Sequence, residues 1–216
     1  MTPDPLPLPQ KLALNYAPAA SRDATAALFA LDTRLSELVA KANEPLLAQL
    51  RLAWWRDELG KPVDARAAGD PVLDAIGQWW GGEEVALAGL VEGWEQLVGD
   101  APLPARAIET FAEGRAGAFA ALARHTGEPE AAADARAAGR LWALADFAAQ
   151  ATDAEERAIA LTFAEETERR APRERRLRPL AVLYGLALRS LAGGGAPLVG
   201  GRRDVLAALR LGMFGR

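Results

Sequence analysis

Apolar residues recur along most of this chain at the spacing typical of amphipathic helices. In the segment 21–43, four leucines follow one another at steps of three or four residues and therefore share one side of a helix. They are Leu28, Leu31, Leu35 and Leu38. We expect this first long helix to begin near Ser21, whose hydroxyl suits a helix N-cap, and to end before Pro45.

A second helix is predicted over residues 46–59, where Leu47, Leu50 and Trp54 mark the side that we expect to be buried. Glycine and proline directly after this segment would end it. Further helices are predicted over about residues 71–80, 84–98, 105–124, 130–150, 153–170, 178–192 and 202–211. No run of β-branched residues bounded by turns interrupts this pattern, so the chain is predicted to be an all-α bundle of about eight or nine helices.

The first fifteen residues differ from the rest, because prolines stand at positions 3, 5, 7 and 9. They predict an extended, proline-rich arm over residues 1–15, followed by one helical domain over 16–216 with enough apolar residues for a full core. The arm lacks the basic and apolar parts of a signal peptide, and no run of about 18 apolar residues predicts a membrane span. We therefore expect a cytoplasmic protein without a transmembrane segment, whose contact with a membrane would be peripheral.

Charge is divided unevenly along the chain. Residues 1–168 carry 14 basic and 27 acidic side chains, whereas residues 169–216 carry 11 and 2. Six arginines lie within 169–178 alone. They could pair with the acidic body of the protein, or form a patch for an anionic lipid or a diphosphate head group. No recognised nucleic-acid motif accompanies them, so we do not expect nucleic acid as a partner.

The segment 16–59 carries the most specific motif of the chain. Tyr16 and Ser21-Arg22 precede Ala27-Leu28-Phe29-Ala30-Leu31, and Leu52-Ala53-Trp54-Trp55-Arg56-Asp57-Glu58-Leu59 follows. This order resembles the squalene and phytoene synthases, in which an aromatic residue precedes an arginine, a helix reading A-L-Y-A-F comes next, and the pattern L-x-x-W-R-x-E-L lies downstream. Looser matches are Leu90 to Gly93 and Phe111 to Gly114.

The resemblance implies a fold and a set of substrate-binding residues. The fold would be the helical bundle of the isoprenoid synthases, in one domain. The residues that the resemblance places beside the substrate in the matched segment are Tyr16, Arg22, Trp54, Trp55 and Arg56. The second acidic motif of the family adds Gln150 to this set.

Most carboxylates of the family's two acidic motifs are missing from this chain. Where the family has DDxxD, this chain reads Ser36-Glu37-Leu38-Val39-Ala40. In the best register of the second motif, Asp146 replaces an asparagine and Gln150 the first aspartate, while Ala154 stands for the second. The resemblance thus implies that Glu37 and Asp146 are what is left of the catalytic acids. Because magnesium needs several oxygen ligands to balance a departing diphosphate, we expect no metal site here.

In keeping the scaffold while lacking most of these acids, the chain resembles the branch of this family that includes a mitochondrial assembly factor for respiratory complex I. This resemblance implies a non-catalytic protein that binds an isoprenoid, an anionic lipid or a protein partner and needs no cofactor. The alternative is a Mg²⁺-dependent prenyltransferase that condenses farnesyl or geranylgeranyl diphosphate head to head. Release of diphosphate would distinguish the two hypotheses.

Overall fold

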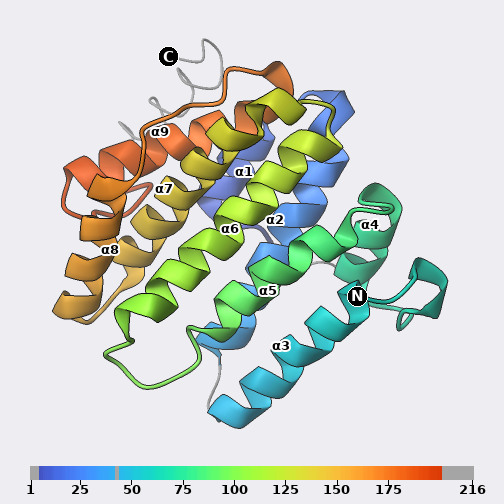
Figure 1. The fold of residues 1–216 in the computed structure, drawn as a ribbon, viewed down its shortest axis with the longest axis horizontal. Helices are drawn as coiled ribbons and strands as arrows, with labels where there is room; N and C mark the ends of the chain where they lie inside the picture. The colour runs from blue at the N-terminus through green and yellow to red at the C-terminus, as the bar shows by residue number, and fades with distance from the viewer. Residues whose placement is uncertain (1–4, 42–43, 201–216) are drawn as a thin grey trace.

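The computed structural model describes residues 5–41 and 44–200, and in this part of the chain every regular element is helical (Figure 1). The all-α prediction is therefore confirmed for these residues, while the predicted helix 202–211 lies outside them. The nine α-helices described are α1 (Leu8–Leu14), α2 (Ala19–Ala40), α3 (Pro45–Leu59), α4 (Pro71–Trp79), α5 (Ala88–Glu95), α6 (Ala105–His125), α7 (Ala132–Gln150), α8 (Ala154–Glu166) and α9 (Arg178–Ala192). Short 3₁₀ turns cover Val63–Ala65, Glu84–Leu87, Pro129–Ala131 and Arg175–Leu177. None of these described helices combines the length and the apolar character needed to cross a bilayer.

The centre of the bundle is the antiparallel pair α6 and α7, which runs diagonally through the view of Figure 1. α5 packs on α6, and α8 and α9 pack on α7. Where α2 meets this pair, Phe29, Phe119 and Trp142 form an aromatic cluster, with ring centroids 6.2 Å apart for Phe29 and Phe119 and 5.5 Å for Phe119 and Trp142. One continuous apolar core thus joins α2, α6 and α7.

Glycines set the spacing between α5 and α6. A Cβ on Gly114 would lie 2.4 Å from the carbonyl oxygen of Gly89, closer than any real Cβ contact. A Cβ on Gly93 would lie 3.1 Å from the Cα of Phe111. The two loosely matched segments, 90–93 and 111–114, therefore meet at a close helix contact that requires small residues.

The proline-rich arm is not extended throughout, because residues 8–14 form α1. Pro7 is the N-cap and Pro9 lies in the first turn, where a missing N–H costs no intrahelical hydrogen bond. Gln10 and Ala13 are buried, and α1 packs against α9 and α2. The prediction of an extended arm over 1–15 was therefore wrong for residues 8–14. Prolines at the N-cap and in the first turn do not prevent a helix from forming.

The first long helix begins earlier than predicted. Pro18 precedes its first residue, Ala19, so Ser21 is not the N-cap. The Ser21 hydroxyl instead donates a hydrogen bond of 2.8 Å to the carbonyl oxygen of Arg176, just before α9. It thereby joins α2 to the segment that leads into α9.

α3 buries the opposite side from the one that we predicted. Leu47, Leu50 and Trp54 are 48%, 59% and 38% exposed. The buried residues of α3 are Ala48, Leu52, Trp55, Glu58 and Leu59. Both sides of this helix carry large apolar side chains, so periodicity alone did not determine which side would face the core.

Candidate functional site

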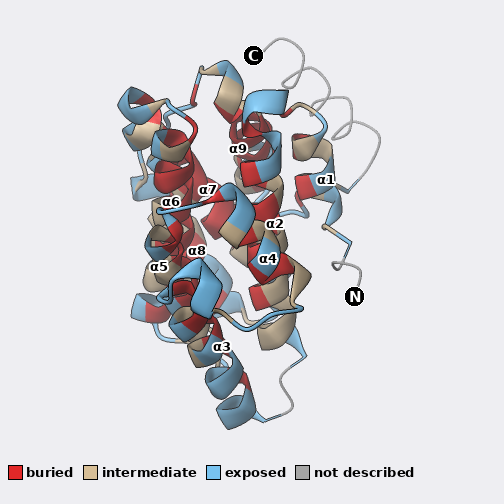
Figure 2. Cartoon of the chain, turned by 90° about the vertical axis from the view of Figure 1, so that its right-hand side faces the viewer, coloured by how far each residue is buried: buried red, intermediate tan, exposed pale blue. Residues whose placement is uncertain are grey.

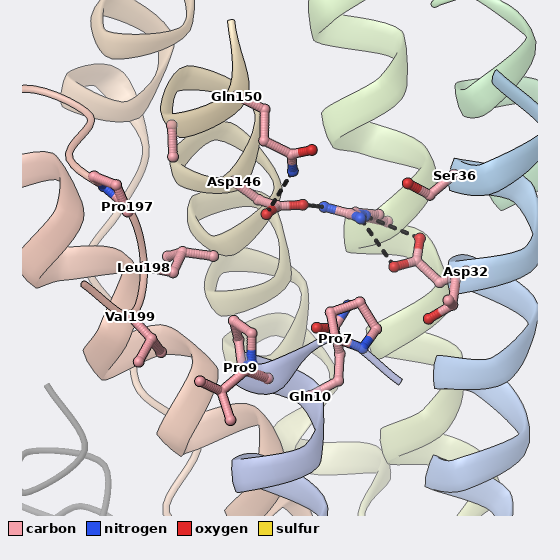
Figure 3. A pocket seen from close by; sticks show the side chains of 14 residues that line it. Pro7, Pro9, Gln10, Asp32, Ser36, Asp146, Gln150, Pro197, Leu198 and Val199 are labelled. Atoms are coloured by element: carbon pink, nitrogen blue, oxygen red, sulfur yellow. Dashed lines mark hydrogen bonds and ion pairs between the residues drawn. The ribbon is translucent and has the colours of Figure 1, made fainter. Parts of the chain in front are cut away.

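Three helices bring one buried arginine between two aspartates. Arg115 on α6 donates from Nε to Oδ1 and from Nη2 to Oδ2 of Asp32 on α2, both at 2.9 Å. Its Nη1 donates to Oδ2 of Asp146 on α7 at 2.7 Å. Figure 3 shows the two carboxylates on opposite sides of the guanidinium. We call Asp32, Arg115 and Asp146 the ion triad.

The surroundings of Arg115 hold it in its charged form. The guanidinium lies 4.2 Å from the ring centroid of Trp142, 4.8 Å from Phe111 and 5.0 Å from Trp94, in favourable cation–π positions. Burial by itself lowers the pKa of this guanidinium, but the carboxylates of Asp32 and Asp146 outweigh that effect, so the pKa of Arg115 is raised. The triad therefore contains a fixed positive charge.

Asp32 has a second donor besides Arg115. The indole N–H of Trp94 on α5 donates a hydrogen bond of 2.9 Å to its Oδ1. Asp146 is likewise held twice, because the side-chain amide of Gln150 donates to its Oδ1 at 2.9 Å. Four helices thus fix the orientation of the two carboxylates.

Two cavities meet at this triad. The first, which we call the polar cavity because the ion triad lies in its wall, has a volume of about 310 Å³ and also has Gln10 and Thr33 in its wall. The start of α1 and the segment 197–199 close its other side, as the labelled Pro7, Pro9 and Leu198 show in Figure 3. The Thr33 hydroxyl is buried and has no hydrogen-bond partner among the described residues.

The second cavity, which we call the apolar cavity, has a volume of about 530 Å³. Its wall is more apolar than polar, and the apolar residues in it include Val39, Trp94, Leu97, Leu103, Phe111 and Phe147. The two cavities share three wall residues: Ser36, Asp146 and Gln150. The two cavities thus adjoin along the carboxylate of Asp146.

Three residues that the acidic motifs pointed to are therefore brought together: Ser36 from the first motif and Asp146 and Gln150 from the second. Glu37 lies elsewhere. Its carboxylate accepts a hydrogen bond of 2.9 Å from Lys41 one turn later, and it is not among the residues in either cavity wall. The two proposed remaining acids, Glu37 and Asp146, thus do not share a site.

The other predicted substrate-binding residues lie outside both cavity walls. Tyr16 follows α1 and is half-buried, and Arg22 donates to the carbonyl oxygen of Leu14 at 3.2 Å. Trp54 is exposed and meets the buried Trp55 edge to face, with ring centroids 5.2 Å apart. These positions place them in contacts between neighbouring helices or at the surface.

Arg56 has a partner of its own on the neighbouring helix. Its Nη1 lies 3.0 Å and 2.8 Å from the two carboxylate oxygens of Glu95 on α5. Burial raises the pKa of Glu95, although the Arg56 charge acts in the opposite direction. The tryptophan-arginine motif therefore helps to attach α3 to α5.

Two residues at the centre of the site, Asp32 and Arg115, were missed by sequence reasoning. A signal for each was present. Asp32 is the one acid on the leucine side of its helix, between Leu28 and Leu35, and Arg115 interrupts a run of glycine, alanine and phenylalanine. A charge on an apolar helix side indicates a buried partner of opposite charge, but the sequence does not name that partner.

The donor set does not fit a magnesium cluster. Both carboxylates of the triad are bound to Arg115, so a divalent ion would have to displace a buried guanidinium to reach them. Among residues 5–41 and 44–200, no three histidine, cysteine, aspartate or glutamate residues gather as metal ligands. The chemistry of this site is therefore that of a fixed ion triad beside an apolar cavity.

The basic stretch 169–178 is partly neutralised by the body of the protein. Arg170 lies 2.6 Å from Glu168 and 3.7 Å from Asp134. Arg176 donates a hydrogen bond of 2.5 Å to the carbonyl oxygen of Thr126 and lies 3.8 Å from Glu128. For these two arginines the structure agrees with pairing to the acidic body.

No match is found when the chain is compared with models of known protein families, with curated protein sequences or with solved structures.

Proposed function

We propose that this chain is a protein of the squalene and phytoene synthase type that binds an isoprenoid or similar lipid chain and does not condense prenyl diphosphates. The observation that carries the proposal is the ion triad, in which Arg115 holds Asp32 and Asp146 between α2 and α7. These are the two helices on which the resemblance places the acidic motifs. Arg115 thus occupies both carboxylates at the place where condensation of prenyl diphosphates would need carboxylates that are open to metal ions.

The geometry of Arg115 supports a structural role rather than a role in binding diphosphate. Nε, Nη1 and Nη2 each donate to a carboxylate, and three aromatic rings lie around the guanidinium. The side chain is 2% exposed. Its charge is thus balanced by carboxylates of the protein itself, and it does not face a leaving group in either cavity.

The apolar cavity supports the binding of a hydrocarbon chain. Its aliphatic and aromatic wall would remove such a chain from water, which stabilises binding by about 0.8 kcal/mol for each buried CH₂ group. An isoprenoid matches this wall, and so does a lipid tail of similar length. The polar residues at one end would fix the orientation of the chain.

The absence of prenyl transfer is tested by a diphosphate-release assay. The purified chain with Mg²⁺ and farnesyl or geranylgeranyl diphosphate should release diphosphate only at the background rate. Steady turnover that falls sharply in Glu37→Gln and Asp146→Asn would overturn this part of the proposal and establish the prenyltransferase alternative.

Chain binding is tested by calorimetric titration with farnesol. The variant Val39→Trp would fill part of the apolar cavity, and it should weaken farnesol binding at least about tenfold. The matched control is Val85→Trp, which adds the same ring at a residue that is 69% exposed and should leave the affinity unchanged. Absence of farnesol binding to the wild type, or equal binding by both variants, would contradict the proposal.

A further inference from the structure

The charges around the two cavities are unequal. Among the described residues in their walls, three carry a carboxylate, namely Asp32, Asp146 and Glu156, whereas only Arg115 carries a positive charge. Arg115 is shared by two of these carboxylates and can balance the charge of one. The described residues of the two walls therefore carry more negative than positive charge, and one of these carboxylates, Asp146, lies where the two cavities meet.

This excess charge is held in place by hydrogen bonds that still leave room for a ligand. Oδ1 of Asp146 accepts from Gln150 and Oδ2 from Arg115, and each carboxylate oxygen can accept a further hydrogen bond. The Asp146 side chain is 17% exposed, so part of it can be reached from the cavities. Its position in both cavity walls makes it the natural contact for a positively charged group.

Two neighbouring features are compatible with a ligand of this kind. The buried Thr33 hydroxyl in the wall of the polar cavity has no partner among the described residues, and such a group normally has one. Phe147 brings an aromatic ring to the apolar cavity next to Asp146 in the sequence of α7. Aromatic rings and carboxylates together are the usual surroundings of a bound ammonium group.

We infer that the ligand is an amphiphilic amine, with its hydrocarbon chain in the apolar cavity and its protonated nitrogen at Asp146, beside Ser36 and Gln150. The inference rests on the proposed function, which supplies the chain, and it adds the chemistry of the head group. A phosphate or diphosphate head at the same place would meet the Asp146 carboxylate without a free cation in the described walls to balance it.

Three probes with one chain and different heads test this inference: farnesylamine, farnesol and farnesyl diphosphate. Calorimetric titrations are made at about pH 7, where an alkyl amine with a pKa of about 10 is protonated. The wild type should bind the amine at least about tenfold more tightly than the alcohol, because a charged hydrogen bond is stronger than a neutral one. The diphosphate should bind most weakly.

Gln150→Lys provides the sharpest variant, because Gln150 is exposed, lies in both cavity walls and can be replaced without opening the core. The new ammonium group would pair with Asp146 and should reduce the affinity for farnesylamine at least about tenfold more than it reduces the affinity for farnesol. Gln49→Lys makes the same change on the exposed side of α3 and serves as the matched control.

Glu156→Gln gives an independent check, since the amide oxygen can still accept the hydrogen bond that Oε1 receives from the Leu103 N–H. It should weaken amine binding selectively. Equal affinity for amine and alcohol, both lost in Val39→Trp, would overturn the inference and leave the proposed function standing. Tightest binding of the diphosphate would also overturn the inference, and failure of all three probes to bind would overturn the proposed function itself.

Discussion

α7 and α3 are both rich in apolar residues, yet they bury them to very different extents. α7 lies between α6, α8 and α9, and its buried residues are Ala135, Ala138, Gly139, Leu141, Trp142, Ala143, Leu144, Ala145 and Ala148. α3 packs mainly on α5 and exposes Leu46, Leu47, Leu50 and Trp54, so that most of it is pale blue in Figure 2. The number of neighbouring helices, rather than apolar content, decides how much of a helix is buried.

The two helices also differ in how they use charge. On α7, Asp146 belongs to a triad whose arginine is 2% exposed, so its electrostatic interactions are only weakly screened by water. On α3, Arg56 pairs with Glu95 while 41% exposed. Substitutions at α7 should therefore affect both stability and the site, whereas those on the outer side of α3 should affect neither.

The largest effect is expected for Arg115→Met. Removing the guanidinium leaves the buried carboxylate of Asp32 and the partly buried carboxylate of Asp146 without the cation between them, and we expect a loss of about 3–5 kcal/mol in the free energy of unfolding. Arg56→Met, which breaks the more exposed pair on α3, should cost about 1 kcal/mol or less. Guanidinium chloride unfolding of both variants measures this difference. Equal losses would contradict the claim that the buried ion triad stabilises the fold more than the exposed ion pair on α3.

A pair of leucines on α3 tests the assignment of its two sides. Leu52→Ala removes a fully buried side chain and should cost about 2–4 kcal/mol. Leu50→Ala makes the same change on the exposed side and should stay within about 0.5 kcal/mol of the wild type. Urea unfolding would refute the observed orientation of α3 if Leu50→Ala proved the more damaging of the two.

The close contact of α5 and α6 leads to a smaller but specific prediction. Gly114→Ala would place a methyl group against the backbone of Gly89, and the resulting shift of the helices should cost about 1–3 kcal/mol. Gly89→Ala on the other helix is the control, because its Cβ would meet no atom within 4 Å. We expect this variant to be as stable as the wild type or slightly more stable in a thermal melt. An equally stable Gly114→Ala would contradict the contact.

The same contrast explains what could be predicted from the sequence. On α2, Leu28, Leu31 and Leu35 form the only large apolar side, so periodicity identified their burial, which the structure confirms at 2% exposure or less. On α3, two apolar sides compete, and the choice depends on where α5 lies. Nothing in the local pattern supplies that information.

Within the candidate site, the acidic motifs of the resembled family led to Ser36, Asp146 and Gln150, which do share cavity walls. The triad itself was not predicted, since Asp32 and Arg115 are 83 residues apart and only the packing of α2 on α6 pairs them. α1 was missed for a local reason, because its prolines occupy the N-cap and first turn, where they are compatible with a helix.

The smallest effect concerns pH and a residue at the end of α3. Glu58 accepts hydrogen bonds from Lys61 at 2.6 Å and from the Ala67 N–H at 2.8 Å, and these contacts lower the pKa of its carboxyl below the ordinary value of 4.5. Such a group stabilises the folded state above its unfolded pKa, and this contribution is lost as the pH falls through the lower folded value. Glu58→Gln should therefore melt at a slightly lower temperature than the wild type at neutral pH. The two melting temperatures should converge as the pH is lowered from 4.5, and a difference that stays constant or grows with acid would show that the Glu58 charge does not stabilise the end of α3.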